Sequence, residues 1–240
     1  MGLLEGKIAV VTGASRGLGY YAALGLAREG AHIIAVARTV GGLEELDDEI
    51  RKDGGAATLV PFDLKDGEAI DRLGAAIYER WGKLDILLAN AGVLGVVTPL
   101  SHMDVKVWDE IMAVNVTANW RLIRSLEPLL KQADAARSLF VTSGAVNKCR
   151  PYVGPYTASK AALEVLVKTW AKEIGHTKMC ANLVDPAILR TAMRASYAPG
   201  EDPMTVPEPQ SIVPALVKLV SVDTTENGKT FLCAEGRFAD

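Results

Sequence analysis

The sequence has few cysteines, few histidines and no long apolar run, and each scarcity excludes a class of protein. Its three cysteines, Cys149, Cys180 and Cys233, are isolated and lack Cys-x-x-Cys spacing. An odd number of scattered thiols argues against a disulfide framework and for a reducing compartment. The three histidines are equally far apart, so we predict no zinc or other metal site. No apolar stretch reaches the roughly 18 residues of a membrane-spanning helix.

An excess of charge of one sign is also missing. The chain has 26 lysines and arginines against 29 aspartates and glutamates, for a net charge of −3, and its pI is about 5.7. Without a basic patch, neither nucleic acid nor an anionic membrane is expected as a partner. The apolar run from Ile8 to Val11, which follows Glu5 closely, is too short for a signal-peptide core. We therefore expect a cytoplasmic protein.

What the sequence does contain suits one large α/β domain. It has 240 residues, of which 49% are apolar and 23% charged, an ordinary composition for a globular protein. No internal repeat, low-complexity tract or linker interrupts it. We therefore expect residues 1–240 to form a single domain.

A glycine cluster directly follows the first apolar run. Ile8 to Val11 predicts a strand buried on both faces, and Gly13, Gly17 and Gly19 come next. Glycines let the backbone turn sharply and approach a pyrophosphate, whose charge is favoured at the N-terminus of the following helix, expected to run to about Glu29. The alternative is that the glycines only form a tight turn.

The end of the second predicted strand, Ile33 to Ala37, bears on which dinucleotide fits. An Asp or Glu at this point would bind a ribose 2′-hydroxyl and repel a 2′-phosphate. The chain instead has Arg38 there, and Arg16 lies within the glycine cluster. Two guanidinium groups at one phosphate favour NADP(H) over NAD(H). The alternative is two solvated surface arginines.

A phenol and an ammonium group lie one helical turn apart at Tyr156 and Lys160. A tyrosine titrates near ~10, and a neighbouring cation favours its phenolate form. Upstream, Ser143 follows a predicted strand, Leu139 to Thr142, and strand ends in open α/β sheets are where ligands bind. A Tyr-x-x-x-Lys pair alone is more typical of an exposed helix face, so its context decides.

Asn115 lies between two valines in a predicted helical stretch from about Asp104 to Leu130. An amide on an inward-facing side is costly to bury unless it is hydrogen-bonded. Asn115 is therefore either a functional residue or a satisfied structural amide.

Taken in order, these motifs resemble the classical short-chain dehydrogenase/reductase family from about Lys7 to Phe231. The motifs are Thr12 to Gly19 with its Gly-x-x-x-Gly-x-Gly spacing, Asn90-Ala91-Gly92, Asn115, Ser143 and Tyr156-x-x-x-Lys160. The resemblance implies an α/β Rossmann-like fold: a doubly wound, parallel, seven-stranded sheet with helices on both faces. Its strand order would be 3-2-1-4-5-6 plus a seventh strand.

The resemblance also implies site residues. The catalytic set would be Asn115, Ser143, Tyr156 and Lys160. The cofactor, NADP(H), would contact Gly13, Ser15, Arg16, Gly17, Leu18, Gly19, Arg38, Asp63, Leu64, Asn90, Ala91, Gly92, Tyr156, Lys160, Pro186 and Thr191. Asp63 would contact the adenine, although an aspartate there could instead cap the helix from Asp66 to Trp81. Asn115 would hold a water that contacts the lysine.

The implied reaction is hydride transfer between NADP(H) and a carbonyl or alcohol substrate. Tyr156 would protonate the developing alkoxide, and Ser143 would donate a hydrogen bond to the same oxygen. Lys160 would lower the pKa of Tyr156 and hold the nicotinamide ribose. The alternative is a dinucleotide-binding module without turnover, acting as a sensor or scaffold.

The segment from about residue 187 to 210 is rich in proline and methionine and is predicted to form a substrate lid. Candidate pocket residues are mostly apolar, which favours an uncharged ketone or aldehyde: Leu94, Ala145, Val146, Val153, Ile188, Met193 and Tyr197. Lys148 and Arg150 could instead meet an acidic substrate, or they could simply be solvated.

Two positions depart from the family pattern. Ala187 stands where the family usually has glycine after Pro186, which makes the local backbone path uncertain, and the C-terminal tail is altered after Phe231. The long helices around Asn115 and Tyr156 resemble those that join family members into homodimers or homotetramers, so we expect a homo-oligomer.

Overall fold

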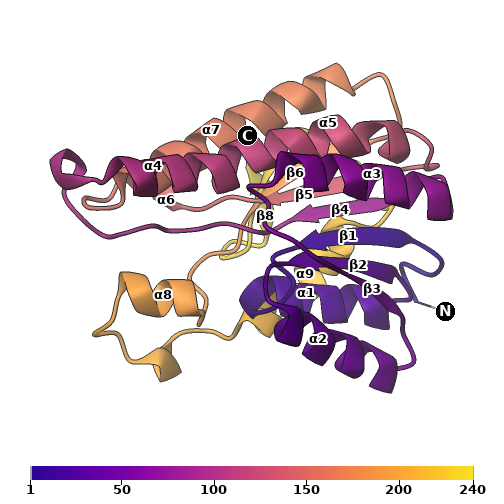
Figure 1. The fold of residues 1–240 in the computed structure, drawn as a ribbon, viewed down its shortest axis with the longest axis horizontal. Helices are drawn as coiled ribbons and strands as arrows, with labels where there is room; N and C mark the ends of the chain where they lie inside the picture. The colour runs from indigo at the N-terminus through magenta and orange to yellow at the C-terminus, as the bar shows by residue number, and fades with distance from the viewer. Residues whose placement is uncertain (1, 240) are drawn as a thin grey trace.

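The computed structural model describes residues 2–239, which form one eight-stranded sheet in the order β3-β2-β1-β4-β5-β6-β7-β8 (Figure 1). The strands are β1 (Ile8–Thr12), β2 (His32–Ala37), β3 (Ala57–Pro61), β4 (Ile86–Ala89), β5 (Arg137–Val141), β6 (Cys180–Asp185), β7 (Thr230–Leu232) and β8 (Arg237–Ala239). The first seven pair in parallel, in the predicted order.

The eighth strand corrects the predicted count of seven. After β7 the chain reverses through Gly236, whose φ of 65° is a left-handed conformation that suits glycine. β8 then returns antiparallel to β7, and the rings of Phe231 and Phe238 meet edge to face with centroids 5.2 Å apart. The altered tail therefore extends the sheet by one short antiparallel edge strand.

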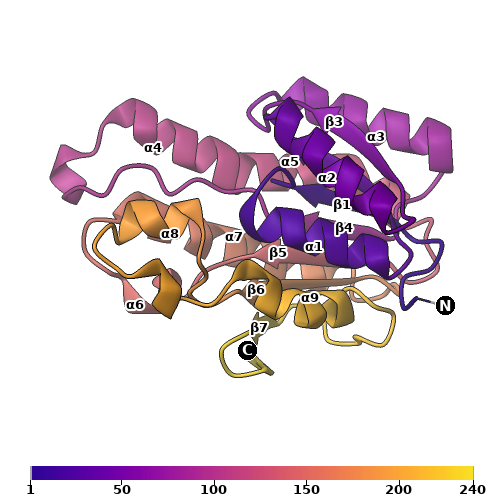
Figure 2. The same ribbon diagram turned by 90° about the horizontal axis from the view of Figure 1, so that it is seen from below.

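Helices cover both faces of the sheet, which confirms the doubly wound α/β fold. The helices are α1 (Gly17–Arg28), α2 (Val40–Lys52), α3 (Gly67–Trp81), α4 (Val105–Met112), α5 (Ala118–Leu130), α6 (Ala145–Lys148), α7 (Gly154–Glu173), α8 (Ala192–Tyr197) and α9 (Val213–Leu219). Helices α1, α2 and α9 pack on one face, and α3, α5 and α7 pack on the other (Figures 1 and 2). Within residues 2–239, no helix combines the length and apolar character needed to cross a bilayer.

Every residue of β1 is buried, because successive side chains alternate between two hydrophobic cores. Ala9 and Val11 belong to the core under α1, whereas Ile8 and Val10 belong to the core under α3 and α5. A continuous apolar run is thus the expected signature of a central parallel strand.

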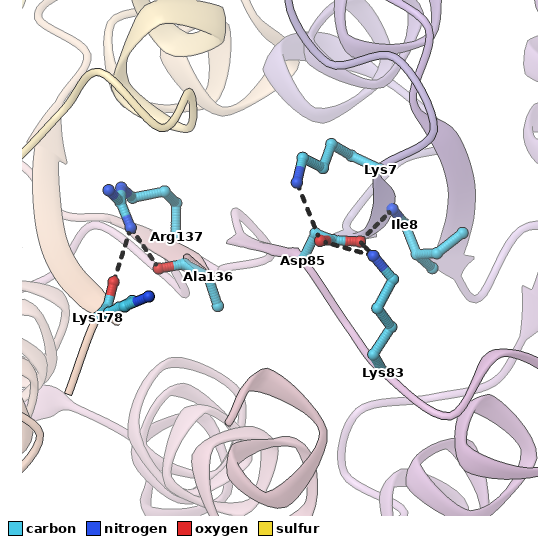
Figure 3. Close-up of polar contacts among 7 residues, drawn as sticks. All are labelled: Lys7, Ile8, Lys83, Asp85, Ala136, Arg137 and Lys178. Atoms are coloured by element: carbon cyan, nitrogen blue, oxygen red, sulfur yellow. Dashed lines mark hydrogen bonds and ion pairs between the residues drawn. The ribbon is translucent and has the colours of Figure 1, made fainter. Parts of the chain in front are cut away.

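The amino-terminal edge of the sheet is fixed by buried charges with many partners (Figure 3). The Asp85 carboxylate accepts from the Ile8 N–H at 3.0 Å and from the Lys83 and Lys7 ammonium groups at 3.1 and 3.4 Å. The Arg137 guanidinium donates to four backbone carbonyls at 2.8 to 3.1 Å: those of Ala136, Lys178, Val222 and Thr224. These contacts tie together the segments that enter β1, β4, β5 and β6.

The predicted lid, residues 187–210, contains α8, the 3-10 turn Pro203–Thr205 and the start of a second 3-10 turn, Pro209–Ile212. Ion pairs hold it in shape. Arg190 pairs with Glu208, and the Arg194 guanidinium donates twice to the Glu201 carboxylate at 2.6 Å. The segment lies at the same end of the molecule as α6 (Figure 2). Its motion on substrate binding stays a prediction.

Candidate active site

The glycine loop after β1 is shaped for close backbone approach. Gly13 and Gly17 adopt φ values of 68° and 57°, which few other residues tolerate. At Gly19, a Cβ atom would lie 2.3 Å from the Gly13 carbonyl oxygen, so only glycine fits. Ser15 packs its backbone against the start of α2, and Leu18 is buried in the core.

Hydrogen bonds join this loop to the Asn90-Ala91-Gly92 turn after β4. The Asn90 amide nitrogen donates to the Thr12 carbonyl at 3.0 Å, and the Thr12 hydroxyl accepts from the Asn90 and Ala91 N–H groups, each at 3.0 Å. The role of the Thr12 hydroxyl was missed from the sequence. Its position at the end of a strand beside the glycines was the available signal.

The two predicted phosphate-binding arginines lie in different settings. Arg16 precedes α1 in an extended conformation and its side chain makes no helix-capping hydrogen bond. Arg38 pairs with Asp63 at 3.6 Å, and Asp63 also pairs with Lys65 at 3.6 Å. A phosphate near Arg38 therefore competes with a carboxylate.

The alternative role of Asp63 as a helix cap is wrong. The Asp66 carboxylate accepts from the Ala69 N–H at 3.0 Å and caps α3. Leu64, the other cofactor residue predicted on this segment, packs its side chain against the core under α3.

Ser143, Tyr156 and Lys160 come together at the carboxyl end of β5. Tyr156 lies in the first turn of α7, and the Ser143 hydroxyl lies near enough to the phenol to oppose the rise in the Tyr156 pKa. The Lys160 ammonium lies 5.9 Å from the centroid of the Tyr156 ring. It donates a 2.7 Å hydrogen bond to the carbonyl of Val141, the last residue of β5. A hydroxyl, a phenol and an amine thus converge.

The pKa of Tyr156 differs from the expectation that Lys160 lowers it. Burial raises the pKa of Tyr156, the neighbouring Ser143 hydroxyl opposes this shift, and the Asp185 carboxylate adds to it. Lys160 is itself so buried that its pKa falls to about 8. Because burial disfavours the charged form of both groups, it outweighs the expected effect of Lys160 on the phenol.

Asn115 sits in a π-helical turn, Ala113–Thr117, between α4 and α5. Its side-chain oxygen accepts from the Val93 N–H at 2.9 Å, and its nitrogen donates at 2.9 Å to the Val93 carbonyl and to the Ser159 hydroxyl. Ser159 in turn donates to the Tyr156 carbonyl at 2.7 Å. The Asn115 amide is therefore satisfied and links the segment after β4 to the turn of α7 that carries Tyr156.

Ser159 was missed as a site residue, although its spacing of three from Tyr156 places it on the same side of α7. Gly92 completes this junction. A Cβ atom there would lie 3.3 Å from the Asn115 side-chain oxygen and 3.4 Å from the Lys160 ammonium. The small residue lets the turn after β4 approach both groups.

The backbone after β6 keeps a left-handed conformation despite the departure from glycine. Ala187 has a φ of 62°, and its N–H donates to the Asp185 carboxylate at 3.0 Å. Pro186 lies between them. Thr191 caps α8 by accepting from the Arg194 N–H at 3.2 Å, and its methyl group would lie 3.7 Å from a Cβ at Gly17. The start of the predicted lid thus faces the glycine loop.

A cavity of about 500 Å³, open to solvent, lies between the loop after α6 and the end of α8. It is lined by Val97, Arg150, Pro151, Tyr152 and Tyr197. Of the predicted pocket residues, Tyr197 lines it. Residues 2–239 hold no group of three His, Cys, Asp or Glu side chains able to bind a metal.

The loop fits a dinucleotide on structural grounds. Gly17 faces open space, because the nearest atom to a Cβ added there is the Thr191 methyl carbon at 3.7 Å. The first turn of α1 contains no acidic residue to oppose a phosphate. The predicted cofactor residues of the glycine loop, the Asn90 turn and the Thr191 segment all lie at the carboxyl edge of the sheet, where open α/β folds bind ligands.

Comparison with known proteins agrees with this geometry. The pattern of the short chain dehydrogenase family matches residues 7–202. The oxidoreductase YciK of Escherichia coli K12 is 35% identical over 239 residues, which cover 98% of this chain and 94% of that protein. A solved structure of E. coli YciK has a TM-score of 0.93 and 36% identity, with 96% of each chain covered. A Shigella flexneri short chain dehydrogenase solved in complex with NADP has a TM-score of 0.93 and 35% identity, covering 97% of this chain and 98% of that one.

Proposed function

The chain belongs to the short-chain dehydrogenase family, and from that premise we propose that it is an NADP(H)-dependent oxidoreductase that interconverts a carbonyl compound and its alcohol. The observation that carries this proposal is the convergence of Ser143, Tyr156 and Lys160 beside the glycine loop. A dinucleotide-binding sensor or scaffold would have no need for these three groups together.

The cofactor supplies the hydride, and the protein handles the proton and the charge. The Tyr156 phenol, kept protonated by burial, gives its proton to the carbonyl oxygen as the alkoxide develops. The Ser143 hydroxyl donates a hydrogen bond to the same oxygen. Two donors aimed at one oxygen stabilise charge that forms only in the transition state, and one such donor contributes about 3 kcal/mol.

Lys160 and Asn115 serve the proton donor. The Lys160 side chain, now bonded to the Val141 carbonyl, has a pKa of about 8, so near neutral pH it can hold or release a proton. Asn115 and Ser159 fix the turn of α7 that presents Tyr156 and Lys160. A water held near Asn115 would return the proton from solvent.

NADP(H) is the proposed cofactor because Arg16 lies in the glycine loop and Arg38 follows β2, with no acidic residue at the end of that strand. Solved relatives are described as complexes with NADP and NADPH. Two Mycobacterium tuberculosis relatives, 35% identical over 206 residues, are instead named NAD-dependent, so a titration must decide. We expect tighter binding of NADPH than NADH by fluorescence titration; equal affinity would refute the preference.

The direct test of the reaction is Tyr156→Phe. We expect NADPH oxidation with a panel of activated aldehydes and ketones to fall about 10²- to 10⁴-fold, the contribution of a positioned acid, while NADPH binding persists. Tyr78→Phe, an exposed tyrosine on α3, is the matched control and should keep full activity. Turnover that survives Tyr156→Phe would remove the proposed acid, and wild-type protein that binds NADPH but never oxidises it would favour the sensor.

We also propose that the chain forms a homodimer or homotetramer. Trp120 on α5 and Val165 on α7 are 45% and 67% exposed, so both helices offer apolar surface that a second copy of the chain would cover. Light scattering should give twice or four times the 25.6 kDa chain mass. A monomer at micromolar concentration would contradict this.

A further inference from the structure

The cavity lined by Arg150, Tyr152 and Tyr197 indicates what kind of substrate the enzyme would bind. Apart from Val97, its lining residues come from the loop after α6 and from the end of α8, two elements at the same end of the molecule (Figures 1 and 2). Tyr152, which lines it, precedes Tyr156 by four residues, and Tyr156 lies in the first turn of α7. A volume of about 500 Å³ suits a small organic molecule.

Arg150 gives this cavity its charge. The other lining residues are a valine, a proline and two tyrosines, so no carboxylate faces the guanidinium from the cavity wall. Among residues 2–239, Arg150 has neither an ion pair nor a hydrogen bond. The arginines of the neighbouring lid differ, because Arg190 pairs with Glu208 and Arg194 with Glu201. The cavity therefore presents an unmatched positive charge.

The backbone around Arg150 is held in an unfavourable conformation. Cys149 and Tyr152, on either side of Arg150 and Pro151, have φ values of 40° and 71° although neither is glycine. Two backbone hydrogen bonds maintain this shape. The Cys149 N–H donates to the Ala145 carbonyl at 3.0 Å, and the Thr98 N–H donates to the Tyr152 carbonyl at 2.9 Å. Strain of this kind persists where the surrounding structure imposes it, often at ligand sites.

Tyr197, the one lining residue from α8, is also fixed. The Arg194 guanidinium stacks 5.3 Å from the centroid of its ring and is itself held by Glu201. The cavity thus presents a planar cation and an oriented phenol. A planar guanidinium matches a carboxylate, to which it can donate two parallel hydrogen bonds.

We propose that Arg150 binds a carboxylate of the substrate, so that the enzyme acts on carbonyl compounds that are also carboxylic acids. This inference rests on the proposed function, because Tyr152 in the cavity wall lies four residues before the proposed proton donor, Tyr156. It selects the acidic alternative over the uncharged ketone or aldehyde favoured by the apolar residues of the sequence.

Binding without turnover tests the inference separately from the reaction. Protein saturated with NADP⁺ is titrated calorimetrically with benzoate and with benzamide, which have the same shape but differ in charge. We expect benzoate to bind more tightly, and Arg150→Gln to remove about 10- to 100-fold of that preference, the range for hydrogen bonds to a charged group. Lys148→Gln removes a positive charge from the same stretch of chain but not from the cavity wall, and it should keep the preference.

Turnover gives the second readout. The acid-to-ester ratio of kcat/KM for 4-carboxybenzaldehyde and its methyl ester should fall about 10- to 100-fold in Arg150→Gln, mostly through KM because the contact is made before the chemical step. Arg150→Lys should retain part of the wild-type acid-to-ester ratio. Equal binding of benzoate and benzamide by the wild type, or a preference unchanged in Arg150→Gln, would overturn the inference. An Arg150 dependence seen with phosphorylated aldehydes but not with carboxylates would overturn it too. If benzoate is preferred but no carbonyl is reduced, the proposed function fails and the carboxylate site stands.

Discussion

Asp85 and Lys160 are charged side chains buried to the same extent, 2% and 3% exposed, at opposite edges of one sheet. At the amino-terminal edge, Asp85 has two ammonium groups and a backbone N–H as partners (Figure 3). At the carboxyl edge, Lys160 has one hydrogen bond, to the Val141 carbonyl, and a pKa lowered to about 8. Two side chains that are equally buried therefore differ in how many partners they have.

This difference indicates that the two ends of the parallel strands have different roles, one in stability and the other in catalysis. A buried charge that is fully paired holds segments together, whereas an underpaired one is destabilised in its charged form and titrates nearer neutral pH. The amino-terminal edge has the first kind of group, at Asp85 and Arg137. The carboxyl edge has the second kind, at Lys160, next to the phenol of Tyr156.

Removing the paired charge should give the largest loss of stability. Asp85→Ala leaves two lysines and the Ile8 N–H without their acceptor, so we expect the free energy of unfolding to fall by about 3 kcal/mol. Urea denaturation followed by circular dichroism measures this. NADPH turnover per folded molecule should not change, because the site lies at the other edge of the sheet.

Asp53→Ala is the matched control for that measurement. Asp53 pairs with Arg28 at 2.7 Å, but both side chains are exposed, so its loss should cost less than about 1 kcal/mol. If Asp85→Ala were no more damaging than this control, the amino-terminal edge would not be the stabilising one.

A smaller effect is expected when a charge is removed at the carboxyl edge. The Asp185 carboxylate raises the pKa of Tyr156, so Asp185→Asn should lower that pKa while its side-chain oxygen still accepts from the Ala187 N–H. Alcohol oxidation needs the phenolate as base, so its pH profile should move to lower pH. Asp134→Asn, an exposed residue between α5 and β5, should leave the profile in place. A shift to higher pH would show that Asp185 does not act on Tyr156 through its charge.

The parallel sheet and the place of the site were predicted from the resemblance to the short-chain dehydrogenase family, and that resemblance rests on local patterns in the sequence. Ile8 to Val11 followed by Gly13 specifies a buried strand and a turn, whatever the rest of the chain does. Tyr156 and Lys160 share a helix face through their spacing alone. Ser143 directly follows a predicted strand, so it was expected at the carboxyl ends of the strands, on the same side of the sheet as the glycine loop.

Contacts between distant segments could not be predicted in the same way. The pairing of Arg38 with Asp63, the hydrogen bond from Lys160 to Val141 and the link from Asn115 to Ser159 depend on side-chain directions that only the packed structure determines. The prediction that the Tyr156 pKa is lowered was wrong for this reason, because a five-residue motif does not determine how deeply its side chains are buried. The short strand β8 was missed because three residues after a turn give too little pattern.

The substitution Lys160→Met tests most directly whether the buried lysine destabilises the fold while being required for catalysis. The pKa of Lys160 falls from 10.5 in the unfolded chain to about 8 in the fold, so the unfolded state binds more protons between these values and wild-type stability should rise with pH across this window. At pH 7 we expect Lys160→Met to be more stable than the wild type by about 2 kcal/mol, with the difference narrowing above pH 8, and to lose NADPH turnover. A variant that is less stable than the wild type at pH 7, or that still oxidises NADPH at the wild-type rate, would contradict the account.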